Sequence, residues 1–233
     1  MNKKILEIFK SLEMKGFWGN YFDSRFYIGY LVSKHKTNNI LDVGCGVGIL
    51  LHLSNAKLKV GLDTSLESVK IGKKLDPYMQ LIVGDATKLP FKENIFEKIL
   101  AVQLLSDLKN LGLDWKKCLE ELKRVSKYEI IFAGNNRLSK HHNYRTWEDR
   151  ISYLNHDEQY ELLKNDFEII NFGYDPHSKI IMYPFKKIIF QIPDKISEFF
   201  MIDKIIFFLL RSKRYLKNGR SYVLICKKRN IRK

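Results

Sequence analysis

Glycines and acidic residues recur at set intervals in the first half of the chain, and both types bind polar ligands. Gly44, Gly46 and Gly48 follow Asp42 directly, and glycines let the backbone turn tightly and let a ligand come close to the main chain. Asp63 lies 19 residues after Gly44, where a carboxylate can accept hydrogen bonds from both hydroxyls of a ribose. Asp42 lies where a charged amino group of the same ligand would sit.

A further acidic position follows at Asp85-Ala86. A carboxylate can accept from the exocyclic amine of adenine, and the next backbone N–H can donate to a ring nitrogen. Each position also has a purely structural interpretation, as a glycine turn, a helix cap, an exposed turn acid or a carboxylate bound to its own loop. Thr64 and Ser65 can cap the following helix, which leaves Asp63 available for a ribose. Together these positions predict a nucleoside site.

The elements that must position these residues alternate between short β-rich runs and longer helical patterns, which is typical of a parallel sheet. We expect strands at residues 39–43, 59–63, 80–85, 97–102, 128–133, 167–172 and 221–226. Helices are expected at residues 47–55, from Thr64 or Ser65 to about Leu75, and at 114–127 and 157–165. This order predicts an α/β fold, Rossmann-like, with a seven-stranded, mostly parallel sheet and helices on both faces. Ligands of such sheets bind at the carboxyl ends of the strands.

Two regions fall outside the alternation. Residues 1–37 predict an N-terminal helical cap, and residues 38–233 the main domain with an insertion at 175–219, in a single domain overall. Within the insertion, residues 199–208 are heavily apolar and stand beside Arg211, Lys213 and Arg214. We hypothesise a lid that receives an apolar or lipid-linked substrate or rests on a membrane surface; a helix buried against the sheet is the alternative.

Charge is concentrated at the end of the chain. The net charge is +15, and residues 211–233 hold ten Lys or Arg and no acid. Such a segment can contact an anionic membrane or RNA, or it can be a solvated surface without a partner. The three cysteines lack the spacing of a disulfide framework or a zinc cluster, so no metal is expected. We see neither a signal peptide nor a membrane span, and expect a cytoplasmic protein with possible peripheral membrane contact.

Several of these motifs resemble those of class I S-adenosylmethionine-dependent methyltransferases, especially the subgroup that methylates small molecules and lipids. Residues 40–48 (ILDVGCGVG) resemble the first motif, and residues 61–65 (GLDTS) the acidic end of the second strand. Residues 84–86 with 89–91 (GDA and LPF) are similar to the third-strand motif. Residues 96–100 and 121–125 occupy the places of the fourth strand and the helix after it. The match extends over residues 39–132.

The resemblance implies S-adenosylmethionine as cofactor. It places the cofactor against these residues: Asp42, Gly44, Gly46, Asp63, Thr64, Asp85, Ala86 and Gln103. Tyr21 or Arg25 would reach its carboxylate. The chain departs from the family where Asp107 replaces a histidine and where residues 126–128 replace a Pro-Gly turn, so we name no catalytic residue. His141, His142, His156 and Asp107 are candidate bases.

The implied function is methyl transfer to a small-molecule or lipid-like acceptor, whose identity and reacting atom are open. An RNA methyltransferase that uses the basic C-terminal segment and a non-catalytic cofactor-binding module are the alternatives. A nicotinamide dehydrogenase is disfavoured, because the third glycine of its fingerprint would fall at Ile49.

Overall fold

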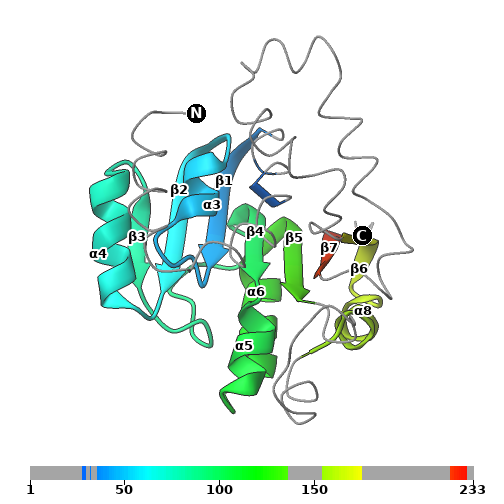
Figure 1. The fold of residues 1–233 in the computed structure, drawn as a ribbon. Coiled ribbons are helices and arrows are strands. Elements are labelled where there is room, and N and C mark those ends of the chain that lie inside the picture. Colours follow the sequence, from blue (N-terminus) through cyan, green and yellow to red (C-terminus); the bar gives the residue numbers. More distant parts are fainter. Residues whose placement is uncertain (1–27, 30–31, 33–35, 136–153, 175–220, 230–233) are drawn as a thin grey trace, which may run out of the picture.

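The structure is a computed structural model that describes residues 28–29, 32, 36–135, 154–174 and 221–229. Figure 1 shows its seven-stranded sheet with helices on both sides. The strands are β1 (Thr37–Val43), β2 (Ala56–Asp63), β3 (Gln80–Val83), β4 (Phe96–Val102), β5 (Ser126–Asn135), β6 (Phe167–Tyr174) and β7 (Ser221–Lys228). The helices are α3 (Ile49–Leu53), α4 (Leu66–Leu75), α5 (Leu104–Asn110), α6 (Trp115–Val125) and α8 (His156–Leu163).

The strand order is β3-β2-β1-β4-β5-β7-β6. Strands β1 to β5 pair in parallel, whereas β7 pairs antiparallel with both β5 and β6. The chain first proceeds outward from β1 to β3 and then returns to place β4 on the other side of β1. This reversal puts the topological switch point of the sheet at the carboxyl ends of β1 and β4. The predicted seven-stranded, mostly parallel α/β fold is confirmed.

Most predicted elements lie where the sequence placed them, with shifted ends. Helix α3 is shorter than predicted, because Gly48 is left-handed and Ser54 is extended at its two ends. Helix α5 was not predicted. Strand β1 begins at Thr37, a residue that the prediction gave to the N-terminal cap. Of the rest of that cap, Ile28, Gly29, Val32 and Lys36 are described, and the first three are helical. The insertion at 175–219 lies outside the described residues.

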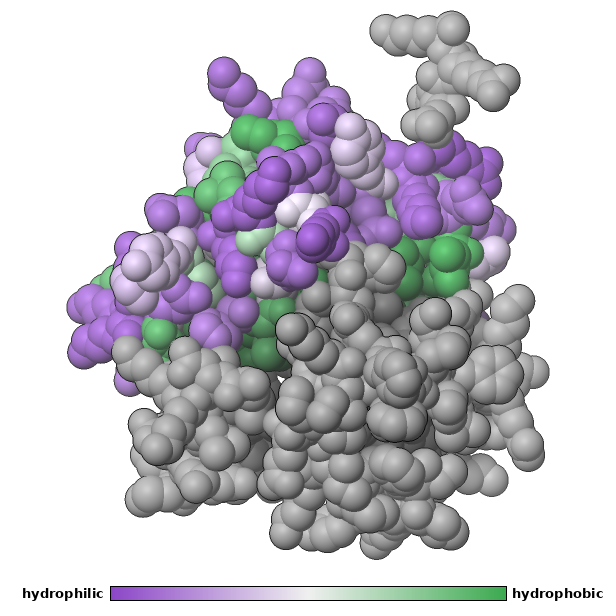
Figure 2. Space-filling model, turned by 90° about the horizontal axis from the view of Figure 1, so that it is seen from above, coloured by the Kyte–Doolittle hydropathy of each residue, from purple (hydrophilic) through white to green (hydrophobic). Residues whose placement is uncertain are grey.

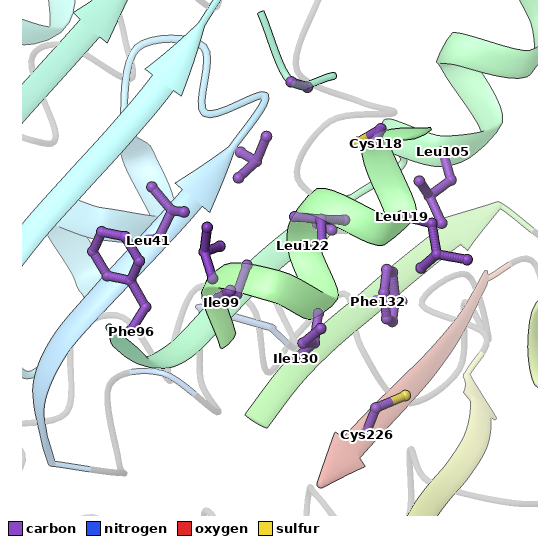
Figure 3. Close-up of a cluster of buried hydrophobic side chains, with 14 of the residues drawn as sticks. Leu41, Phe96, Ile99, Leu105, Cys118, Leu119, Leu122, Ile130, Phe132 and Cys226 are labelled. Atoms are coloured by element: carbon purple, nitrogen blue, oxygen red, sulfur yellow. The ribbon is translucent and has the colours of Figure 1, made fainter. Parts of the chain in front are cut away.

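Two apolar clusters, one on each face of the sheet, form the core. The first packs α6 and α5 against strand residues, as Figure 3 shows for Leu119 and Leu122 above Ile130 and Phe132. The second joins α3 and α4 to the alternate strand residues, which point to the opposite face. This alternation explains the continuous apolar runs of the central strands, since both of their faces are covered.

The surface of the described residues is mainly polar in the view of Figure 2, where hydrophobic side chains form small, separate patches. Helix α6, with 11 residues, is the longest described helix. Within the described ranges, no helix is long and apolar enough to cross a membrane.

Candidate functional site

The loop between β1 and α3 is shaped by its three glycines. Gly44, Gly46 and Gly48 have φ angles of 75°, 55° and 78°, in the left-handed region that side chains disfavour. The amides of Gly44 and Cys45 both donate to the Leu62 carbonyl, at 2.8 and 3.2 Å. The loop is thereby bonded to the end of β2, and its glycines allow a close approach to the main chain.

Behind the loop, two more glycines allow close packing. A Cβ atom at Gly61 would lie 2.8 Å from the Cys45 Sγ, so the buried Cys45 side chain fits only because β2 has no side chain there. A Cβ atom at Gly72 of α4 would lie 2.8 Å from the Val47 carbonyl oxygen. Helix α4 therefore packs directly against the loop backbone and supports its shape.

Asp63, the last residue of β2, connects three parts of the site. Its Oδ2 accepts the Gly46 N–H at 2.7 Å, and its Oδ1 accepts the Ser65 N–H at 2.9 Å. Its backbone carbonyl accepts the Gly84 N–H at 3.0 Å, just after β3. Ser65 caps α4 through the Ser68 N–H, as predicted, but Asp63 is not left free: two amides hold its carboxylate.

Asp42 and Gln103 lie at the same edge as Asp63. Asp42 is buried and registers with Gly61 of β2 and Leu100 of β4, at the switch point. Gln103 directly follows β4 and has a φ of 62°, an uncommon conformation for a residue with a side chain. Its N–H donates to the Ala133 carbonyl of β5 at 2.6 Å, which fixes the turn from β4 into α5. Thr64 is exposed beside Asp63.

Asp85 and Ala86 begin the loop after β3. Asp85 is exposed, and its Oδ1 accepts the Thr87 N–H at 2.8 Å. This hydrogen bond is the main cause that lowers the pKa of Asp85 below its ordinary value. Ala86 is buried in the first core cluster. The loop thus presents an ionised, exposed carboxylate from a backbone that is anchored by its neighbour.

Two α6 residues with no predicted role contact the same loop. Glu121 accepts the Leu89 N–H at 2.8 Å, and Arg124 donates to the carbonyls of Leu89 and Phe91 at 3.1 and 2.8 Å. Opposite charges at positions i and i+3 of a predicted helix are a signal that could have indicated an ion pair. Nothing in that spacing indicated the loop, which lies more than 30 residues away in sequence.

The candidate bases differ in their surroundings. His156 is buried at the start of α8, where its Nδ1 lies 2.8 Å from the Asp157 carboxylate and its ring contacts Tyr222 edge to face. That environment indicates a structural histidine. Asp107 is exposed in the first turn of α5. His141, His142, Tyr21 and Arg25 lie outside the described residues.

The donors and acceptors at this edge fit a nucleoside with a cationic end. Each Asp63 oxygen receives one amide and keeps a second lone pair, so two ribose hydroxyls can still donate to it. A dinucleotide fits less well, because its pyrophosphate requires amides of the glycine loop. The Gly46 amide is already bonded to a carboxylate that would repel the phosphate.

Comparisons with known proteins point to the same chemistry. Residues 41–132 match the family model described as a methyltransferase domain. Demethylmenaquinone methyltransferase of Renibacterium salmoninarum is 41% identical over 90 residues, which are 38% of this chain and 36% of that protein. The tRNA (carboxymethyluridine(34)-5-O)-methyltransferase of Arabidopsis thaliana is 34% identical over 98 residues, 42% of this chain and 24% of that protein. The aligned segments thus span less than two thirds of either relative.

A solved structure matches over a longer range. A protein from Thermotoga maritima, described as a SAM-dependent methyltransferase, aligns with a TM-score of 0.60 at 16% identity, covering 94% of this chain and 96% of that one. At this identity the likeness shows the fold. Family model, relatives and fold agree: residues 41–132 match a methyltransferase domain, within a fold that the chain shares with a protein described as a SAM-dependent methyltransferase.

Proposed function

We propose that this chain transfers the methyl group of S-adenosylmethionine to a small-molecule or lipid-like acceptor. The Asp63 carboxylate carries the proposal: it accepts one amide from the glycine loop and one from Ser65 at the start of α4, and it retains two lone pairs toward a ribose. The proposed cofactor contacts are those of the whole predicted set: Asp42, Gly44, Gly46, Asp63, Thr64, Asp85, Ala86 and Gln103. Bound S-adenosylmethionine would supply an activated, positively charged methyl donor.

The residues of the chain would contribute mainly binding and alignment. Asp42, Asp63 and Asp85 place three acids along one edge of the sheet, which suits a ligand with a cationic end. Holding a nucleophile in line with the methyl carbon can lower the activation barrier by about 7–11 kcal/mol. A general base is needed only when the nucleophile must lose a proton. We therefore assign no base.

The choice of a small-molecule or lipid-like acceptor is supported by sequence and by topology. A relative that is 41% identical over 90 residues is named for demethylmenaquinone, a quinone. The basic C-terminal segment is less suited to hold RNA at the site, because β7 divides it. Ser221 pairs with Asn135 at the end of β5, whereas Lys227 pairs with Glu129 near its start.

Residues 227–229 consequently lie at the opposite edge of the sheet from the site, about 20 Å away at ~3.4 Å per strand residue. Lys228 also has structural partners there, donating to the Ser126 carbonyl at 2.7 Å and to the Asn94 side chain at 2.8 Å. Contact of the basic segment with an anionic membrane remains compatible with this arrangement, and co-sedimentation with anionic vesicles tests it.

The acceptor class can be tested with radiolabelled S-adenosylmethionine. The purified protein is incubated separately with small-molecule, lipid and RNA fractions of a cell extract. We expect label in the small-molecule or lipid fraction, and its loss with an Asp63→Asn variant. Label confined to RNA, together with a salt-dependent gel shift of that RNA, would establish the alternative acceptor.

A further inference from the structure

We infer that Glu121 and Arg124 are positioning residues that hold the adenine-binding end of the cofactor site. The inference rests on the proposed function, which places adenine at Asp85 and Ala86. It concerns α6, a helix with no proposed contact to the cofactor. The ion pair on α6 sets the position of the loop between Val83 and Phe96, and thereby the preference of the site for adenine over other bases.

The loop has little support of its own. Residues 84–95 contain neither helix nor strand, and the hydrogen bonds within them span short turns: the Asp85 carbonyl accepts the Lys88 N–H at 3.1 Å, the Asp85 side chain accepts the Thr87 N–H, and the Leu89 carbonyl accepts the Phe91 N–H at 2.8 Å. Immediately after this turn, both backbone groups of Leu89 bond to α6: its N–H to Glu121 and its carbonyl to Arg124. The path of the chain at Leu89 therefore depends on the ion pair.

The ion pair is formed by two hydrogen bonds. Arg124 Nε lies 2.7 Å from Glu121 Oε1, and Nη2 lies 2.7 Å from Oε2, which is the two-pronged geometry of an arginine–carboxylate pair. The hydrogen bond from Arg124 is the main cause that lowers the pKa of Glu121, with the Leu89 N–H adding to it. Arg124 Nη1 further donates to the Phe91 carbonyl. One planar guanidinium thus bonds the helix to two loop carbonyls.

Apolar contacts below the loop transmit this constraint to Asp85. Ala86 and Leu89 are both buried in the first core cluster, which also includes Cys118 of α6, and the Phe91 ring packs against that cluster. The far end of the loop is also fixed to α6, since the Asn94 and Ile95 amides donate to the carbonyls of residues 124 and 125. Asp85 is an exposed residue of a loop that is bonded to Asp63 at its start, through the Gly84 N–H, and to α6 from Leu89 onward.

Lys123 offers a matched control on the same helix. It forms ion pairs with Glu120 at 3.2 Å and with Asp166 at 2.7 Å, on the side of α6 toward the end of α8. Losing it removes a charge and two ion pairs from α6 without touching the loop. A change in cofactor binding caused by general destabilisation of α6 would appear when either Lys123 or the Glu121–Arg124 pair is substituted. A change caused by the position of Asp85 would appear only when the Glu121–Arg124 pair is substituted.

The test compares the binding of S-adenosylhomocysteine with that of S-inosylhomocysteine, which lacks the exocyclic amine, by calorimetry on the full chain. Arg124→Lys keeps the charge but cannot form the fork. We expect its affinity for the adenosyl ligand to fall up to about tenfold. Its preference for the adenosyl over the inosyl ligand should also shrink, while Lys123→Met retains the wild-type preference. Glu121→Gln is the second variant, and thermal unfolding verifies that each variant is folded.

The results of this experiment distinguish failure of this inference from failure of the proposed function. An unchanged preference in folded Arg124→Lys and Glu121→Gln, with normal wild-type binding, overturns this inference alone. A wild-type protein that does not bind S-adenosylhomocysteine overturns the proposed function, and this inference with it. An equal loss of preference in Lys123→Met would also contradict the assignment, because that variant leaves the loop contacts intact.

Discussion

The Gly46 N–H donates to the Asp63 Oδ2 at 2.7 Å, across 17 residues of sequence. This hydrogen bond joins the glycine loop to the acid at the end of β2, the two features that would each be ambiguous alone. It exists because the glycine loop is in the left-handed region and because β2 lies directly beside β1. The loop and the acid thus form one rigid unit.

Asp63→Asn should weaken S-adenosylhomocysteine binding about tenfold or more, the equivalent of at least ~1.4 kcal/mol. The asparagine replaces one acceptor oxygen by a donor group, so a bond to Gly46 or Ser65 and a ribose bond are both affected. Calorimetry measures the loss. Glu67→Gln, an exposed acid four residues later in α4, is the control and should bind as the wild type does. Wild-type affinity in Asp63→Asn would refute the ribose assignment.

Gly61→Ala should destabilise the fold by about 1–3 kcal/mol, because overpacked cores must shift. Its Cβ would lie 2.8 Å from Cys45 Sγ and 2.6 Å from a Leu81 methyl group. Removing the sulfur with Cys45→Ala should recover part of the loss, so that the double variant is more stable than additivity predicts. Denaturant unfolding of all four proteins measures the coupling, and strict additivity would show that Cys45 and Gly61 do not share this space.

Acid should destabilise the protein partly through Glu97. Its carboxylate accepts bonds from Thr37 and from the backbone and side chain of Asn38, at 2.8–2.9 Å, chiefly from Asn38. These bonds lower the pKa of Glu97 below its ordinary value of 4.5. Because the folded pKa is the lower one, the stabilisation is complete above pH 4.5 and is lost as the pH falls below it.

The matching variant is Glu97→Gln. This substitution should lower the free energy of unfolding by about 1 kcal/mol at pH 7, because it removes the ionised carboxylate that accepts these hydrogen bonds. The difference from the wild type should narrow as the pH falls through 4.5. Urea unfolding between pH 7 and pH 3 gives both values, and Glu93→Gln serves as an exposed control. A difference that stayed constant with pH would exclude this role for Glu97.

The three thiols should resist modification in the native protein. Cys45, Cys118 and Cys226 are all buried. Burial raises the pKa of Cys118 to about 12, and burial also raises that of Cys226. The reactive thiolate is therefore scarce at pH 8. Titration with Ellman's reagent should find little reaction until guanidinium exposes all three; a thiol that reacts at the rate of free cysteine without denaturant would contradict the burial.

The sheet could be predicted because its strands have continuous apolar runs that end in glycine or acid. Element ends were less predictable, since they depend on pairing between distant residues. Ser126 caps α6 and already pairs with Phe96, so β5 begins two residues before the predicted Tyr128. Helix α5 was missed because its leucines continue directly from β4, and only the turn at Gln103 separates the two elements.

The site was predicted as a row of acids but not as a set of contacts. The spacing of Asp42, Asp63 and Asp85 indicated one edge of the sheet, which parallel pairing confirms. The two amides that hold Asp63 could not be inferred from spacing, because they depend on φ angles in the loop. The Glu121–Arg124 contacts with the loop after β3 depend on how α6 crosses the sheet. They could not be predicted from the sequence, because the contacting residues lie more than 30 positions apart.

The most direct test of the central claim is calorimetric titration of the wild-type protein with S-adenosylhomocysteine and, separately, with NAD. The carboxylate at the Gly46 amide predicts saturable binding of S-adenosylhomocysteine at one site per chain and no binding of NAD. Binding of NAD without binding of S-adenosylhomocysteine would contradict the account, because the glycine loop would then serve a pyrophosphate.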